Sequence, residues 1–199
     1  MLTLLAIVPY QIGINIAVLQ FMKSIASPGL DQVMAAITQS YLLVLPLIAL
    51  YMLAKRDKNV YVFVVAVVLF YIINDAIKLI VKEPRPCNTP ASDFPSISGG
   101  INAYSCEANY SFPSSHAAVL TGLPAFMGKY RYIRPLYIVW LLVVLFGKMY
   151  IGAHYFTDIV AGAVLSIVMA YILYRYKDSI NSIINSILKK IIPFLSIKE

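Results

Sequence analysis

Long apolar runs almost free of charge are the feature that most restricts the folds open to this chain. Hydrophobic residues make up 60% of the sequence and charged residues only 13%, whereas a soluble globular domain is usually about 25% charged. The composition argues against a soluble domain, a disordered chain, a collagen-like repeat and a disulfide-dense secreted module. We therefore interpret residues 1–199 as a single membrane-embedded domain.

The apolar runs predict an all-α, polytopic membrane helical bundle with five or six transmembrane helices. A helix needs about 20 mostly apolar residues to cross the bilayer. The residues 1–30 form an N-terminal segment broken by polar side chains, which either spans the membrane or lies at its surface. Five further spans are expected at residues 36–54, 60–79, 114–128, 133–151 and 155–174, the third being short unless it extends at one end.

Isoleucine and leucine recur at helical spacing over residues 178–195, with Lys189 and Lys190 on the other side. This pattern predicts an amphipathic C-terminal helix on the membrane surface. The alternative is a helix packed against a partner subunit, so the sequence leaves a homo-oligomer open.

The formal net charge of +7 follows from basic residues that punctuate the apolar runs, and we expect no nucleic-acid partner. Basic residues in short loops mark the cytoplasmic side. Three basic clusters, at residues 55–58, 129–134 and 175–177, fall on one side if the five spans alternate. The loops 79–113 and 148–158 then face the extracytoplasmic side of a cell membrane.

Two cations lie where the second expected span meets the outer side. Ionisable residues at membrane depth are expensive and suggest function. Lys78 and Arg85 are seven positions apart and share one helical face if the helix continues. The alternative is that they reach out to lipid head groups.

The segment from Pro113 to His116 opens the third expected span. The unpaired N–H groups of a helix start, together with a serine hydroxyl from this segment, would bind an anion within reach of His116. A capped helix followed by a structural histidine is the alternative.

The second histidine, His154, precedes Asp158 by four positions, so a helix starting there would place both on one face. An aspartate that accepts from one ring nitrogen leaves the other as an oriented nucleophile. A buried structural pair is the alternative. Lys148 lies in the same outer turn.

Together these residues resemble the three ordered signature motifs of the phosphatidic acid phosphatase type 2 superfamily, which also contains the vanadium haloperoxidases. Two positions depart from the usual motifs: Ser115 replaces a glycine, and Gly147-Lys148 replaces Ser-Arg. Lysine keeps the charge but lacks the planar fork of arginine. The matching motifs, within residues 78–158, are Lys78-x6-Arg85-Pro86, Pro113-Ser114-Ser115-His116 and Gly147-Lys148-x5-His154-x3-Asp158.

The resemblance implies a lipid phosphatase that works without a metal or other cofactor. His154 would be the nucleophile, Asp158 its orienting partner and His116 the general acid and base. The phosphate would be bound by Lys78, Arg85, Ser114, Ser115 and Lys148. The expected substrate is a polyprenyl diphosphate, with phosphatidate and phosphatidylglycerophosphate as alternatives. A lipid-phosphate carrier and a haloperoxidase are the rival classes.

Two further features lie in the outer loop between the first two motifs. Cys87 and Cys106 are the only cysteines, and on the outer side they are expected to form a disulfide. Asn109-Tyr110-Ser111 fits a glycosylation sequon. We expect it to be unoccupied, because it lies so close to Ser114.

Overall fold

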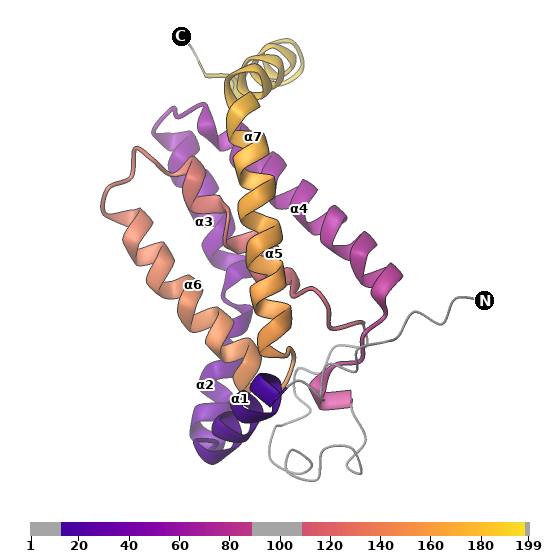
Figure 1. Ribbon diagram of the computed structural model, residues 1–199. Coiled ribbons are helices and arrows are strands. Elements are labelled where there is room, and N and C mark those ends of the chain that lie inside the picture. Colours follow the sequence, from indigo (N-terminus) through magenta and orange to yellow (C-terminus); the bar gives the residue numbers. More distant parts are fainter. Residues whose placement is uncertain (1–12, 89–108, 198–199) are drawn as a thin grey trace, which may run out of the picture.

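The computed structural model describes residues 13–88 and 109–197, and over these ranges the protein is an all-α bundle (Figure 1). This confirms the predicted fold class. The α-helices are α1 (Gly13–Ser24), α2 (Pro28–Gln39), α3 (Tyr41–Ala54), α4 (Asn59–Val81), α5 (Ser115–Leu120), α6 (Ile133–Tyr150) and α7 (Phe156–Ile191), and the short 3-10 helices are η2 (Pro86–Asn88), η4 (Leu123–Phe126) and η5 (Pro193–Leu195).

Four helical stretches are long and apolar enough to cross a membrane: 28–54, 59–88, 133–150 and 156–191. They correspond to four of the five expected spans. Large apolar side chains point outward along them, including Leu43 on α3, Ile80 on α4 and Val139 on α6. Such a surface suits a lipid solvent, in which exposed leucine and isoleucine carry no hydration penalty.

The expected span at residues 114–128 is not found, so the predicted count of five or six spans is not confirmed for the described residues. α5 has six residues and is about 9 Å long at 1.5 Å per residue. It ends where Gly122 approaches α7 so closely that a Cβ would lie 2.6 Å from the Ser166 carbonyl oxygen. Pro124, which cannot donate to a continuing helix, follows in η4. α5 packs against α4 and α7 inside the bundle.

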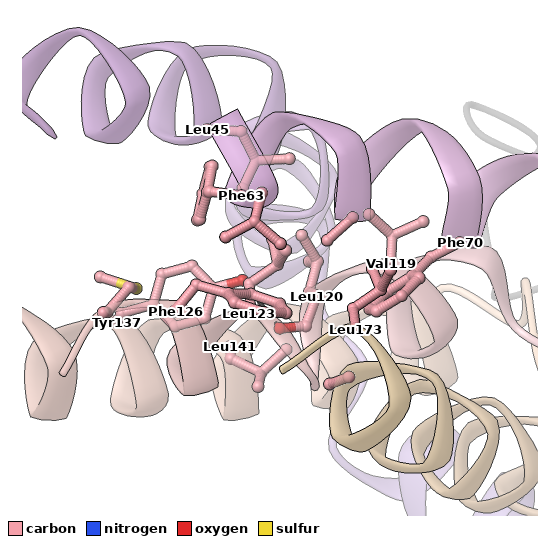
Figure 2. Close-up of a cluster of buried hydrophobic side chains, with 14 of the residues drawn as sticks. Leu45, Phe63, Phe70, Val119, Leu120, Leu123, Phe126, Tyr137, Leu141 and Leu173 are labelled. Carbon is pink, nitrogen blue, oxygen red and sulfur yellow. Dashed lines mark hydrogen bonds between the residues drawn. The ribbon is translucent and has the colours of Figure 1, made fainter. Parts of the chain in front are cut away.

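The core lies where α5 and η4 meet the longer helices. Phe63 and Phe70 of α4 pack with Leu120 of α5 and with Leu123 and Phe126 of η4, all of them buried (Figure 2). Side chains of α3, α6 and α7 complete this cluster. The short buried helix therefore lies at a fixed position among the spans.

The predicted amphipathic segment is helical but is not a separate helix, because α7 continues from Phe156 to Ile191. Its last turns bend away from the first part of α7 at the top of Figure 1. Asn181 Oδ1 accepts from the backbone N–H of Val62 at 3.0 Å. Ile180, Ile184 and Leu188 pack on the core, whereas Ile183, Ile187 and Ile191 are exposed. Its position at the membrane surface stays a prediction.

The described part of the N-terminal segment is tied to α7. In α1, the Asn15 amide donates to Thr157 Oγ1 at 2.9 Å and accepts from the Thr157 N–H at 3.1 Å. α1 has 12 residues, about 18 Å at 1.5 Å per residue, which is too short to cross the hydrocarbon core alone. Residues 1–12 lie outside the described ranges, so the prediction for the whole segment stays open.

Two of the basic loops lie together at one end of the bundle. Asp57, between α3 and α4, lies 3.5 Å from Lys129 Nζ and accepts from the Tyr130 hydroxyl at 3.1 Å. The ends of α4 and α6 and the start of α7, which hold the motifs, are at the opposite end (Figure 1). The arrangement agrees with the predicted alternation of spans, and the side of the membrane that each end faces stays a prediction.

Candidate active site

Backbone hydrogen bonds join the segments that carry the three motifs. The Cys87 N–H, just after the first motif, donates to the Gly152 carbonyl in the third at 3.0 Å. The Ser114 N–H in the second motif donates to the Asp158 carbonyl at 3.1 Å. Residues far apart in the sequence thus meet at one end of the bundle.

His154 and Asp158 form the expected pair at the start of α7. His154 Nδ1 lies 3.4 Å from Asp158 Oδ2, and both side chains are buried. The same carboxylate oxygen accepts from the Tyr155 N–H at 2.9 Å. A helix N-terminus favours a negative charge, which explains why this buried carboxylate is tolerated there.

Arg85 determines which nitrogen of His154 carries the proton. Arg85 Nη1 lies 3.2 Å from His154 Nε2 and donates to the Ala153 carbonyl at 2.7 Å. A guanidinium has donors only, so Nε2 must be the ring nitrogen with the lone pair. The proton is then on Nδ1, which faces Asp158. His154 is held in the tautomer in which Nε2 is nucleophilic.

Lys78 and Arg85 are buried and contact oxygen atoms of one short segment. Lys78 Nζ donates to the carbonyls of Tyr110 at 2.6 Å and Ser111 at 3.0 Å. Arg85 Nε donates to the Asn109 carbonyl at 3.0 Å, and Arg85 Nη2 donates to Asn109 Oδ1. Several oxygens around two fixed cations are an arrangement that phosphate oxygens would reproduce.

His116 and Lys148 complete the cluster. Lys148, in the last turn of α6, is fully buried. Burial lowers the pKa of His116 well below its ordinary value, and the charges of Lys148, His154 and Arg85 lower it further. Within the described residues, His116 Nε2 has no hydrogen-bond partner. The rings of His116 and Tyr41 pack edge to face, with their centroids 4.7 Å apart.

The two serines of the second motif already have partners. Ser114 caps α5, accepting from the Ala117 N–H at 3.5 Å. Ser115 Oγ accepts from Asn74 Nδ2 of α4 at 3.0 Å. Their predicted role in phosphate binding stays a prediction.

Burial keeps His154 neutral. Desolvation lowers the pKa of His154 to about 4. The hydrogen bond that His154 donates to Asp158 opposes this shift, and the charge of Arg85 lowers the pKa further. At neutral pH the imidazole therefore retains the lone pair that a nucleophile needs.

Three site residues were not identified as such from the sequence: Asn109, Ser111 and Asn74. Ser111 donates to Asp158 Oδ2. Asn109 and Ser111 belong to a segment considered only as a glycosylation sequon. Their place directly before the second motif was the available signal. Asn74 lies four positions before Lys78, and an amide within a mostly apolar span was also a signal.

An apolar cavity of about 270 Å³ opens between α3, α4 and α5 and reaches His116. Its mouth includes the exposed side chains Val68, Tyr71 and Ile72 of α4. Leu45 of α3 lines the cavity as well. The cavity thus connects the lipid-facing surface of the bundle with the polar cluster.

The predicted disulfide falls partly outside the described ranges. Cys87 lies in η2, close to Arg85, whereas Cys106 lies outside the described residues. The disulfide between them stays a prediction.

The part of the chain that holds the three motifs matches a known protein family. The model of the PAP2 superfamily matches residues 59–182. The chain belongs to the PAP2 superfamily. Lipid A 4'-phosphatase of Bacteroides thetaiotaomicron is 31% identical over 166 residues, covering 76% of this chain and 72% of that protein.

Two solved PAP2-like structures share the fold. Aquifex aeolicus LpxE superposes with a TM-score of 0.68 and 18% identity, covering 84% of this chain and 98% of the other. The transmembrane PAP2 type phosphatidylglycerolphosphate phosphatase of Bacillus subtilis gives 0.63 and 20% identity, with coverage of 83% and 85%. The chain is therefore a membrane protein of a phosphatase superfamily, with the three PAP2 motifs assembled in one site.

Proposed function

We propose that this PAP2 protein hydrolyses the phosphate group of a membrane lipid through a phosphohistidine intermediate on His154. The observation that supports this most directly is the contact of Arg85 Nη1 with His154 Nε2 at 3.2 Å. It joins a phosphate-binding side chain to the nitrogen that holds the lone pair. Binding alone would require the cation but not an oriented neutral imidazole, which argues against a lipid-phosphate carrier.

In the first step, the lone pair of His154 Nε2 attacks phosphorus and the bond to the leaving oxygen breaks. The negative charge of the bound phosphate would favour the protonated form of His116, which then gives its proton to that oxygen. Asp158 stabilises the positive charge that develops on His154. In the second step, neutral His116 takes a proton from water, the resulting hydroxide attacks phosphorus, and the P–N bond breaks to release inorganic phosphate.

Lys78, Arg85 and Lys148 would neutralise the charge of the transferred phosphoryl group. Catalysis of phosphoryl transfer depends mainly on positioning and electrostatic stabilisation. All three side chains are almost fully buried, where a charge acts more strongly than in water. We therefore propose activity without a divalent metal. Loss of turnover in chelator, restored by Mg²⁺, would contradict this.

The apolar cavity beside His116 supports a substrate with a hydrocarbon tail. Its position would let the tail stay among apolar side chains while the phosphate reaches the buried cations. A polyprenyl diphosphate remains our first candidate. A saccharolipid phosphate is the second, because the relative at 31% identity is a lipid A 4'-phosphatase. The site would face the extracytoplasmic side of the cell membrane.

The deciding experiment measures phosphate release by the purified protein in detergent. The panel contains a polyprenyl diphosphate, lipid A, phosphatidylglycerophosphate, phosphatidate and a water-soluble phosphomonoester. We expect release from at least one lipid, and none from the variant His154→Ala. Lipid binding without release by the wild type would favour a carrier, and halide oxidation with bound vanadate would favour a haloperoxidase.

The intermediate is tested with substrate labelled with ³²P at the reacting phosphate. Acid quenching destroys phosphohistidine but alkaline quenching preserves it, so label should remain on the protein only after the alkaline quench. We expect His116→Ala to accumulate this label and His154→Ala to carry none. Equal labelling of both variants would contradict the assigned roles.

A further inference from the structure

Ser111 makes a set of contacts with the reacting pair that its place outside the three motifs does not predict. Its side chain is fully buried. The Ser111 hydroxyl donates to Asp158 Oδ2 and lies 3.4 Å from His154 Nδ1. One hydroxyl therefore lies between the carboxylate and the imidazole.

The bond between His154 and Asp158 is long for a charge-assisted pair. The two atoms are 3.4 Å apart, whereas an N–H···O bond usually measures about 2.7–3.2 Å. Asp158 Oδ2 already accepts from the Ser111 hydroxyl and from the Tyr155 N–H. The lone pairs that would form a short bond to His154 Nδ1 are thus engaged with other donors.

The backbone of Ser111 is also fixed. Its N–H donates to the Glu83 carbonyl at 2.8 Å, and its carbonyl accepts from Lys78 Nζ at 3.0 Å. These two bonds hold the Ser111 backbone, and with it the hydroxyl, against the end of α4. Rigid support of this kind is what a partner of a catalytic group requires.

We propose that Ser111 is a positioning residue for the nucleophile. Its hydroxyl competes for Asp158 Oδ2, keeps the bond between Asp158 and His154 long, and so keeps the imidazole neutral with Nε2 directed at the phosphate site. The phosphoryl group is then attacked by the lone pair of Nε2. Asp158 forms its strongest interaction with the ring only when positive charge develops on it.

Other charged groups act on His154 and stay in place when Ser111 is changed. The His154 ring interacts electrostatically with four other groups: Lys78 at the end of α4, Arg85 before η2, Asp158 on α7 and His116 on α5. Glu83 interacts with Asp158 and so affects His154 indirectly. A change that follows loss of the Ser111 hydroxyl alone therefore reports on that hydroxyl.

The test uses the full chain in detergent and exploits its two histidines. Protein labelled with ¹⁵N-histidine gives two ring systems, which the variant His116→Asn assigns. In Ser111→Ala, Asp158 is free to pair more closely with His154. We expect the titration midpoint of the His154 ring to rise by about one pH unit.

Activity is measured in the same preparations, and this arm rests on the proposed function. We expect kcat of Ser111→Ala to fall about 10–100-fold, with KM changed less than about 3-fold because the phosphate-binding cations remain. Ser111→Thr and Ser111→Val have nearly the same shape, so Thr should retain the wild-type midpoint and Val should resemble Ala. This pair keeps the test valid if Ser111→Ala fails to fold.

The matched control is Ser166→Ala. Ser166 is equally buried and accepts from the Gly122 N–H at 2.8 Å, away from His154. Its removal should change thermal stability without moving the His154 midpoint. An unchanged midpoint in Ser111→Ala, or a lowered kcat without a raised midpoint, overturns the proposal. If the wild type releases no phosphate from any lipid, the proposed function fails and the midpoint alone decides the role of Ser111.

Discussion

Arg85 Nη1 lies 3.2 Å from Nε2 of His154, the ring nitrogen opposite the one that faces Asp158. The Arg85 side chain therefore fixes the tautomer of His154 and occupies the space next to the lone pair of Nε2. An incoming phosphate would take the N–H donors of Arg85 and leave Nε2 facing phosphorus. We propose that substrate binding and exposure of His154 Nε2 are coupled in this way.

This coupling predicts a large effect of Arg85→Gln. Loss of one preorganised donor to a developing charge costs about 10²–10³ in kcat, and we expect kcat/KM for the lipid substrate to fall at least that far. Arg56→Gln is the matched control, because Arg56 is exposed at the opposite end of the bundle. Similar losses in both variants would indicate a general effect of charge and not a role at the site.

The pH dependence should follow the neutral state of His154. The pKa of His154 in the folded protein is about 4, below its ordinary value, because the ring is buried. Activity should therefore persist well below pH 6.5 and disappear as pH falls through about 4, where the lone pair is protonated. The measurement is the kcat/KM profile, with ionisation of the substrate followed separately by ³¹P resonance. An acid limb near 6.5 that is not due to the substrate would contradict the assignment.

The same shift has a consequence for stability. The unfolded chain binds a proton at His154 near pH 6.5, whereas the folded protein does so only near 4. The contribution of this neutral histidine is complete above about pH 6.5 and is lost as pH falls toward 4. His154→Gln should flatten the fall of the unfolding temperature over this window. An identical pH dependence in wild type and variant would contradict this.

Gly147 should not accept a side chain. A Cβ there would lie 2.7 Å from Thr38 Cγ2 on α2, so Gly147→Ser, which restores the usual residue of the third motif, should destabilise the protein by about 1–3 kcal/mol. Adding Thr38→Ser to Gly147→Ser removes the opposing methyl group, so the double variant should recover much of the lost stability. Gly128→Ala is the control, since nothing lies within 4 Å of a Cβ there. Thermal unfolding in detergent measures all four proteins.

Blocking the apolar cavity should separate lipid from soluble substrates. Ile72→Trp enlarges a side chain at the mouth of the cavity, and we expect kcat/KM for the lipid to fall about 10-fold or more, within the range that pocket contacts contribute. Turnover of the water-soluble phosphomonoester should stay unchanged. Ile167→Trp on α7, which is similarly exposed, controls for a tryptophan on the lipid-facing surface. Equal losses on both substrates would place the lipid elsewhere.

Sequence patterns were sufficient for features that depend on local chemistry. Long apolar runs with few charges predicted four of the spans, because a hydrocarbon solvent imposes length and apolarity on each helix independently. Motif spacing predicted that His154 and Asp158 would meet, and they do, although His154 precedes the N-cap Tyr155 and therefore does not share a helical face with Asp158. The segment 114–128 failed the same reasoning. It is apolar because protein surrounds it, and composition alone does not distinguish burial in protein from burial in lipid.

The sequence by itself determined an all-α membrane protein and the residue types of its candidate phosphate site. Only the tertiary structure decided how those residues contact one another. It placed Arg85 on the lone pair of His154 and brought Ser111 onto Asp158, 47 positions away. It also showed that Gly147 is where α2 and α6 touch. Such contacts arise from the packing of helices distant in the chain, and no local periodicity or spacing encodes them.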